Sequence, residues 1–139
     1  MEITANALQT VAANSNILFT ETAVRGNCSL LHREGSGQVT LRGITDQCRA
    51  RFRVSFGANV GLPAAGTVAP ITLAITINGE PVGPATMIST PAAVSEFNNV
   101  FASVFLDVPN GCCYTISVKN IGEDPIDVQN ANLIVERVA

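Results

Sequence analysis

Hydrophobic and polar residues alternate along most of this chain, in short runs that Gly, Pro, Asn and Asp separate. Alternation with a period of two is typical of β-strands, because successive side chains of a strand point to opposite faces. No stretch carries the apolar stripe of a helix, and 91–96 is expected to form one turn at most. The pattern predicts ten strands, near 8–12, 16–24, 28–33, 37–42, 48–57, 71–78, 86–90, 97–108, 112–119 and 126–137.

Two Asn-Gly pairs, at 78–79 and 110–111, are strong signals for tight turns between strands. Many short strands with such turns indicate an all-β sandwich or jelly roll of two sheets. We expect one jelly-roll domain over 9–139, preceded at 1–8 by an N-terminal arm or a lead-in to the first strand. The uncharged stretch 57–70 is predicted to be a long loop that docks on the domain.

The strand at 48–56 has one apolar face and one basic face. Cys48, Ala50, Phe52, Val54 and Phe56 form the face expected in the core. The opposite face carries Arg49, Arg51, Arg53 and Ser55. Like charges at alternate positions lie about 7 Å apart and repel unless they are paired. Two kinds of partner are open: Glu96, Asp107 or Glu136 of the same chain, or carboxylates across a subunit interface.

The strand at 97–108 is apolar on both faces. Val100, Ala102, Val104, Leu106 and Val108 form one face, and Phe101, Ser103 and Phe105 form the other. A two-layer sandwich leaves one face of each sheet to solvent, so a second apolar face indicates cover by another subunit. The sequence therefore predicts an oligomer whose interface contains Arg49, Arg51, Arg53, Phe101, Ser103 and Phe105.

Composition agrees with a partly covered surface. Of 139 residues, 47% are hydrophobic and 14% are charged, whereas about a quarter of an average chain is charged. The net charge of −3 argues against nucleic-acid binding. No apolar run is long enough to span a membrane, and the N-terminus lacks a secretory signal. If the chain is complete, we expect it to assemble in the cytoplasm.

Four cysteines, Cys28, Cys48, Cys112 and Cys113, are candidates for disulfides, and three pairings are possible. The alternative is that all four are reduced and buried as small hydrophobic side chains. Cys112 and Cys113 are neighbours on a predicted strand, so they are expected to face opposite sides.

Five segments, in this order, carry a resemblance: TVAANSNILF (10–19), LHREGSGQVTL (31–41), RARFRVSF (49–56), LAITINGEPV (73–82) and NANLIV (130–135). Over about residues 8 to 137 the chain resembles the globular heads of bacterial collagen-like spore-surface proteins and phage-encoded proteins. These belong to the jelly-roll superfamily of tumour necrosis factor (TNF) and the complement heads. The resemblance implies a ten-stranded jelly roll, a tight homotrimer with adjacent termini, and a structural or adhesive role without catalytic residues.

One departure from these relatives is the absence of a Gly-X-Y stalk, since the 11 glycines show no period of three. It favours a free-standing decoration or head-fibre protein of a phage or prophage, located in the virion, with a capsid or other particle protein as its partner. The alternatives are a glycan-binding adhesion module at the cell surface and a subunit of a spore surface or disulfide-linked filament. The lack of Trp and the single Tyr argue against glycan binding.

We predict no enzyme, cofactor or metal site. The only histidine, His32, is expected to be an ordinary strand residue, and no nucleophile elbow or phosphate loop occurs. Glu123, Asp124 and Asp127 cluster in one turn and are expected to be solvated.

Overall fold

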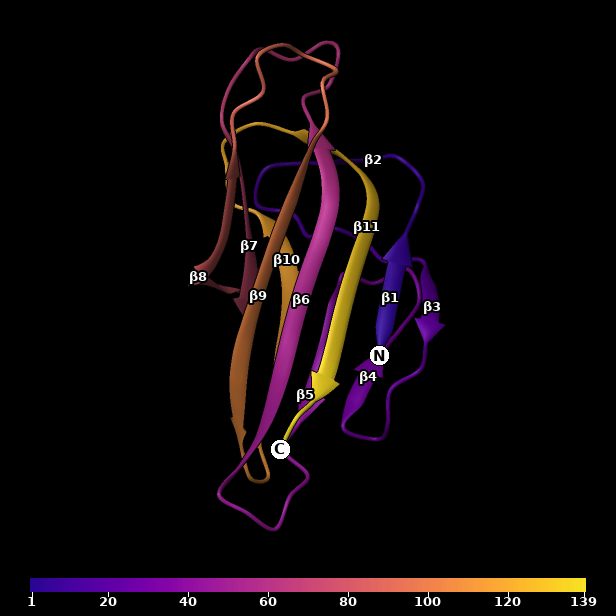
Figure 1. The fold of residues 1–139 in the computed structure, drawn as a ribbon, viewed down its shortest axis with the longest axis vertical. Coiled ribbons are helices and arrows are strands. Elements are labelled where there is room, and N and C mark those ends of the chain that lie inside the picture. Colours follow the sequence, from indigo (N-terminus) through magenta and orange to yellow (C-terminus); the bar gives the residue numbers. More distant parts are fainter.

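The computed structural model describes residues 1–139 as an all-β fold without helices (Figure 1). It has eleven strands: β1 (Glu2–Ala5), β2 (Gln9–Val11), β3 (Glu21–Val24), β4 (Leu30–His32), β5 (Gln38–Arg42), β6 (Arg49–Gly61), β7 (Ile71–Ile77), β8 (Glu80–Ser89), β9 (Asn98–Pro109), β10 (Cys113–Asn120) and β11 (Ile126–Arg137).

The strands form two antiparallel sheets that face each other. The first sheet has the order β3-β1-β11-β6-β9, with β2 paired to the beginning of β11. The second has the order β4-β5-β10-β7-β8. In Figure 1 the loops at 62–70 and 90–97 lie at the upper end of the sandwich, and the loop at 43–48 lies at the lower end beside the C-terminus. The predicted all-β, two-sheet architecture is confirmed.

The core lies between the sheets and is one cluster of 31 buried residues. Strand β6 shows how the sequence builds it, because alternate residues from Ala50 to Val60 are buried while their neighbours are not. Phe56 of this strand packs edge-to-face on Phe19, with ring centroids 6.3 Å apart. The predicted apolar face of β6 is therefore correct, except that Cys48 is exposed at its lower end.

The N-terminal segment differs from the expectation of an arm or lead-in. Residues Glu2–Ala5 are themselves a strand, β1, which pairs with both β11 and β3. Ile3 is fully buried in the core. The structure has eleven strands where ten were predicted, and β1 is the additional one. Its four residues do alternate between polar and apolar, but so short a run was not recognised as a strand.

Two other boundaries also differ from the prediction. Strand β6 continues to Gly61, because its last residues pair with the first residues of β9, and only 62–70 remains a loop. Strand β8 begins at Glu80, whereas the predicted strand begins only at residue 86, and it contains Pro81 and Pro84. β8 is at the edge of its sheet, where proline is tolerated because half of the backbone groups have no strand partner.

A buried asparagine, Asn120, joins three chain segments at the upper end of the sandwich. Its side chain is fully buried. The amide nitrogen donates to the carbonyl oxygens of Val11 (3.2 Å), Ala12 (3.4 Å) and Asp124 (2.9 Å). The amide oxygen accepts from the backbone N–H of Gly122 at 3.0 Å. Every hydrogen-bonding group of this side chain is thus used within the protein.

Candidate oligomerisation surface

The outer face of the first sheet carries two aromatic rings that the chain itself leaves uncovered. Phe101 is 66% exposed and Phe105 is 60% exposed on β9. Between them, the hydroxyl of Ser103 lies 2.9 Å from that of Ser55 on β6. Opposite Phe101 stands Gly57, which has no side chain to cover the ring. We call Phe101, Ser103 and Phe105 the aromatic strip. As predicted, these residues share one outward face.

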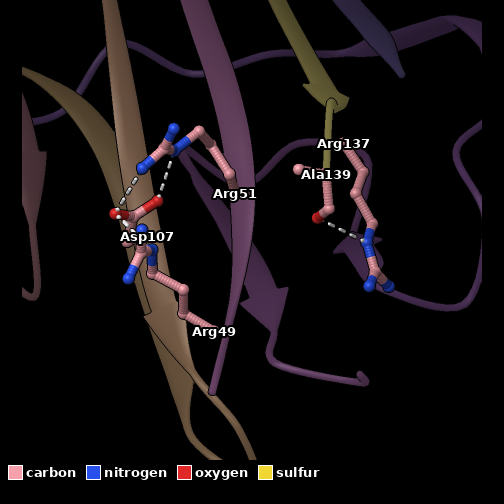
Figure 2. A network of polar contacts seen from close by, with 5 residues as sticks. All are labelled: Arg49, Arg51, Asp107, Arg137 and Ala139. Carbon is pink, nitrogen blue, oxygen red and sulfur yellow. Dashed lines mark hydrogen bonds and ion pairs between the residues drawn. The ribbon is translucent and has the colours of Figure 1, made fainter. Parts of the chain in front are cut away.

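The three arginines of β6 lie beside the aromatic strip and are paired within the chain. Figure 2 shows two of them, Arg49 and Arg51, at Asp107. Asp107 of β9 forms ion pairs with these two. Arg51 Nε is 2.8 Å from Asp107 Oδ1, and Arg49 Nε is 3.1 Å from Oδ2. Arg53 pairs with Glu136 of β11. Of the two alternatives from the sequence, pairing in the same chain is therefore observed for the whole row. The predicted partner Glu96 takes no part in these ion pairs.

The pairing with Arg51 changes the acid strength of Asp107. The hydrogen bond from Arg51 is the main reason that the pKa of Asp107 lies below its usual 3.8, with smaller attractions from the charges of Arg51 and Arg49. The same hydrogen bond and charge raise the pKa of Arg51. The arginines and the aspartate are all exposed, so water and salt screen these interactions.

A row of asparagines crosses the upper part of the same face. Asn99 of β9 donates to Asn59 Oδ1 of β6 at 3.3 Å, and Asn59 donates to Asn130 Oδ1 of β11 at 3.2 Å. The sequence does not predict this row, because its members come from three strands and only the register brings them together. The face is thus divided into an amide zone, the aromatic strip and an arginine–carboxylate zone.

All four cysteines are free and exposed. The expectation that reduced cysteines would be buried is wrong, and no disulfide is present within the chain. The segments that carry them meet around the loop at 43–48: Arg42 donates to the carbonyl oxygen of Cys28 and pairs with Cys113, and the N–H of Gly43 donates to the carbonyl oxygen of Cys112. Cys112 and Cys113 follow the tight turn predicted at 110–111, where Gly111 has a φ of 79°.

The remaining candidate residues form no catalytic arrangement. His32 Nδ1 donates to the carbonyl oxygen of Gln38 at 3.1 Å, and His32 Nε2 is buried without a partner. Asp127 accepts a hydrogen bond from the hydroxyl of Thr10 at 2.8 Å, and the structure contains no group of three or more acidic, His or Cys residues placed to hold a metal ion. No helix is long and apolar enough to cross a membrane.

Comparison with known proteins identifies the fold and does not assign a family. The sequence matches no protein-family model and no curated protein. The structure is similar to the globular domain of the zebrafish complement 1qA protein, with a TM-score of 0.64 and 12% identity over 96% of this chain and 93% of that one. It is also similar to the Eiger TNF of S. frugiperda, with a TM-score of 0.68 and 11% identity over 100% of this chain and 92% of that one.

A third solved structure, the C-terminal domain of the sugar-binding protein EclA, has a TM-score of 0.44 and 10% identity over 95% of this chain and 79% of that one. The first two structures show that the chain has the jelly-roll fold of the complement heads and of TNF. The predicted fold is confirmed at this level.

Proposed function

We propose that this chain is a non-enzymatic structural subunit that forms a homotrimer through the outer face of its first sheet. The trimer decorates or projects from a particle, such as the capsid of a phage or prophage. The observation that carries the proposal is the aromatic strip, which is exposed in a single copy of a chain that otherwise builds a well-packed core.

The exposed aromatic area contributes a substantial part of the free energy that association needs. A phenylalanine side chain buries roughly 200 Å² when fully covered, so the exposed fractions of Phe101 and Phe105 leave roughly 250 Å² in water per copy. At about 25 cal/mol per Å², covering both rings contributes about 6 kcal/mol per protomer before the entropic cost of association. A second copy is the fitting partner, because the sequence resemblance and the fold both belong to jelly-roll heads and each neighbouring arginine already contacts a carboxylate of its own chain.

The role on a particle surface rests on the sequence resemblance to phage-encoded and spore-surface heads. A rigid sandwich with few charges suits a structural subunit better than a mobile binding protein. On this face each arginine of the row has a carboxylate partner in the chain, although three arginines share two carboxylates and so leave one excess positive charge.

Light scattering coupled to size-exclusion chromatography tests the trimer. The native protein is expected at three times the protomer mass of 14.5 kDa. Phe105→Glu is expected to shift it to the single mass, because three new carboxylates would be buried together. Ile88→Glu is the matched control, since Ile88 is 69% exposed on the edge strand of the other sheet, and it is expected to stay trimeric. A native protein that elutes at 14.5 kDa at tens of micromolar contradicts the proposal.

The particle role has its own test. An antibody against the chain, used for gold labelling of particles released after prophage induction, is expected to label virions. Label on the spore or cell envelope and none on virions would overturn this part of the proposal in favour of the surface alternatives.

A further inference from the structure

Four exposed thiols at one end of the sandwich take no part in the proposed function. Free cysteine is among the residue types that are most often buried, so an exposed group of four calls for a chemical reason. The thiols come from three chain segments: the loop after β3, the residue before β6, and the turn between β9 and β10. Tertiary structure, not sequence proximity, gathers them.

Backbone hydrogen bonds hold the segments of Cys48 and Cys112 side by side. The N–H of Asn110 donates to the carbonyl oxygen of Cys48 at 3.0 Å, and the N–H of Cys112 closes the turn onto Pro109 at 3.0 Å. In addition, the N–H of Gly43 donates to the carbonyl oxygen of Cys112 at 2.8 Å. These backbone hydrogen bonds fix the positions of the two segments relative to each other. The thiols of Cys48 and Cys112 are both unpaired within the chain.

Cys48 belongs to the same side of the molecule as the arginines. It opens into a hollow of about 280 Å³, lined also by Gln47, Arg49, Arg51 and Ala139. The outward residues of β9 run from the aromatic strip through Asp107 to Pro109, where the turn that carries Cys112 begins. If the aromatic strip lies along the contact between protomers, the turn and the hollow lie at the end of that contact.

The other two cysteines belong to the second sheet. Cys113 is the strand partner of Arg42, and the Arg42 guanidinium donates to the carbonyl oxygen of Cys28 at 3.3 Å. Neither of them lines the hollow beside Cys48, which makes them suitable controls.

We infer that Cys48 of one protomer forms a disulfide with Cys112 of the next, so that oxidation locks the trimer covalently. The inference rests on the proposed trimer. Threefold symmetry supports a pair of different residues: Cys48 to Cys112 can be repeated three times around a closed ring, whereas a bond between two copies of one cysteine leaves the third copy unpaired. The hollow beside Cys48 is the place that receives the neighbouring turn.

The chemistry is thiol–disulfide exchange with a small-molecule disulfide such as oxidised glutathione. One protein thiolate attacks the glutathione disulfide and releases one glutathione thiol. The second protein thiolate then attacks the mixed disulfide and releases the other. Each protein disulfide thus forms as two thiols lose two protons and two electrons, and one glutathione disulfide is reduced to two glutathione molecules.

The test compares the full-length protein before and after incubation with oxidised glutathione, on denaturing gels without reductant. A covalent trimer is expected, which dithiothreitol converts to monomer. Cys48→Ser and Cys112→Ser should each abolish it, and Cys28→Ser and Cys113→Ser should retain it. Peptide mapping of the trimer band is expected to give a cross-linked peptide containing Cys48 and Cys112.

Two results would overturn the inference. One is a monomer band after oxidation in which Cys48 and Cys112 are joined within one chain. The other is a covalent dimer joined through two copies of the same cysteine. Native mass under reducing conditions separates the two proposals: a reduced trimer that oxidation does not cross-link rejects only the disulfide, whereas a reduced monomer rejects the trimer itself.

Discussion

Replacement of Asn120 measures how much the upper end of the sandwich depends on one buried amide. Asn120→Ala removes four hydrogen bonds and leaves three carbonyl oxygens and one N–H without their partner. A typical internal hydrogen bond contributes about 1 kcal/mol, so the free energy of unfolding is expected to fall by about 4 kcal/mol. This is a large part of the roughly 5–15 kcal/mol of a typical domain.

Asn120→Asp keeps the shape of the side chain and is expected to cost at least as much. The carboxylate has no N–H to donate, and one of its oxygens would face the carbonyl oxygens of Val11, Ala12 and Asp124 in a fully buried position. Asn99→Ala is the control, because Asn99 is exposed and its one side-chain donation is a 3.3 Å bond. We expect it to change stability by less than about 0.5 kcal/mol.

Urea unfolding followed by far-ultraviolet circular dichroism gives these free energies by linear extrapolation. All variants are compared at one protein concentration, since the stability of an oligomer depends on concentration. If both Asn120 variants lose less than about 1 kcal/mol, the amide does not hold these segments together and the reasoning from its hydrogen bonds is refuted.

Two further predictions concern the lower end and the arginine zone. Gly43→Ala places a methyl group against the carbonyl oxygens of Pro109 and Cys112, and we expect it to lower the free energy of unfolding in urea by about 1–3 kcal/mol. Gly83→Ala is the control, because its methyl group meets nothing within 4 Å and should cost much less; equal losses for the two variants would contradict the steric argument. The pKa of Asp107 is lowered in the folded state, so its stabilising contribution is present above its usual pKa of 3.8 and is lost as the pH falls through its lower folded value. The difference in unfolding free energy between the native protein and Asp107→Asn should therefore be small but measurable near neutral pH, and it should disappear in strong acid. A difference that persists in strong acid would show that the ion pair does not cause it.

The sequence predicted the parts of the fold that depend on local alternation. The buried face of β6 and the outward aromatic strip both follow from a period of two, which is a property of a single strand. The arginine row was visible for the same reason. Its partners Asp107 and Glu136 were among three candidates, and only the register of β6 with β9 and β11 selects them.

The features that the sequence did not predict depend on pairing between distant segments. The last residues of β6 include Gly57 and Gly61, which are poor strand formers, and they become a strand because β9 and β11 supply the partners. The predicted strand at 86–90 left out the first part of β8, which contains two prolines that an edge position tolerates. Cys48 is exposed for a different reason: it lies in the bend before the first residue of β6, where the strand alternation no longer applies.

The pairing of the first and last strands determines how the protein responds to mechanical force. Met1 and Val135 exchange two backbone hydrogen bonds of 2.8 Å, and β1 continues upward from there against β11. Tension applied through Met1 and Ala139 would load this pair and the bonds of Val138 and Ala139 to Arg51 first. It would then separate β1 from β11 one residue pair after another, instead of shearing the whole ladder at once. In the proposed particle, attachment through the faces of the sandwich would share the force of drag among many contacts. Attachment through the two chain ends would not.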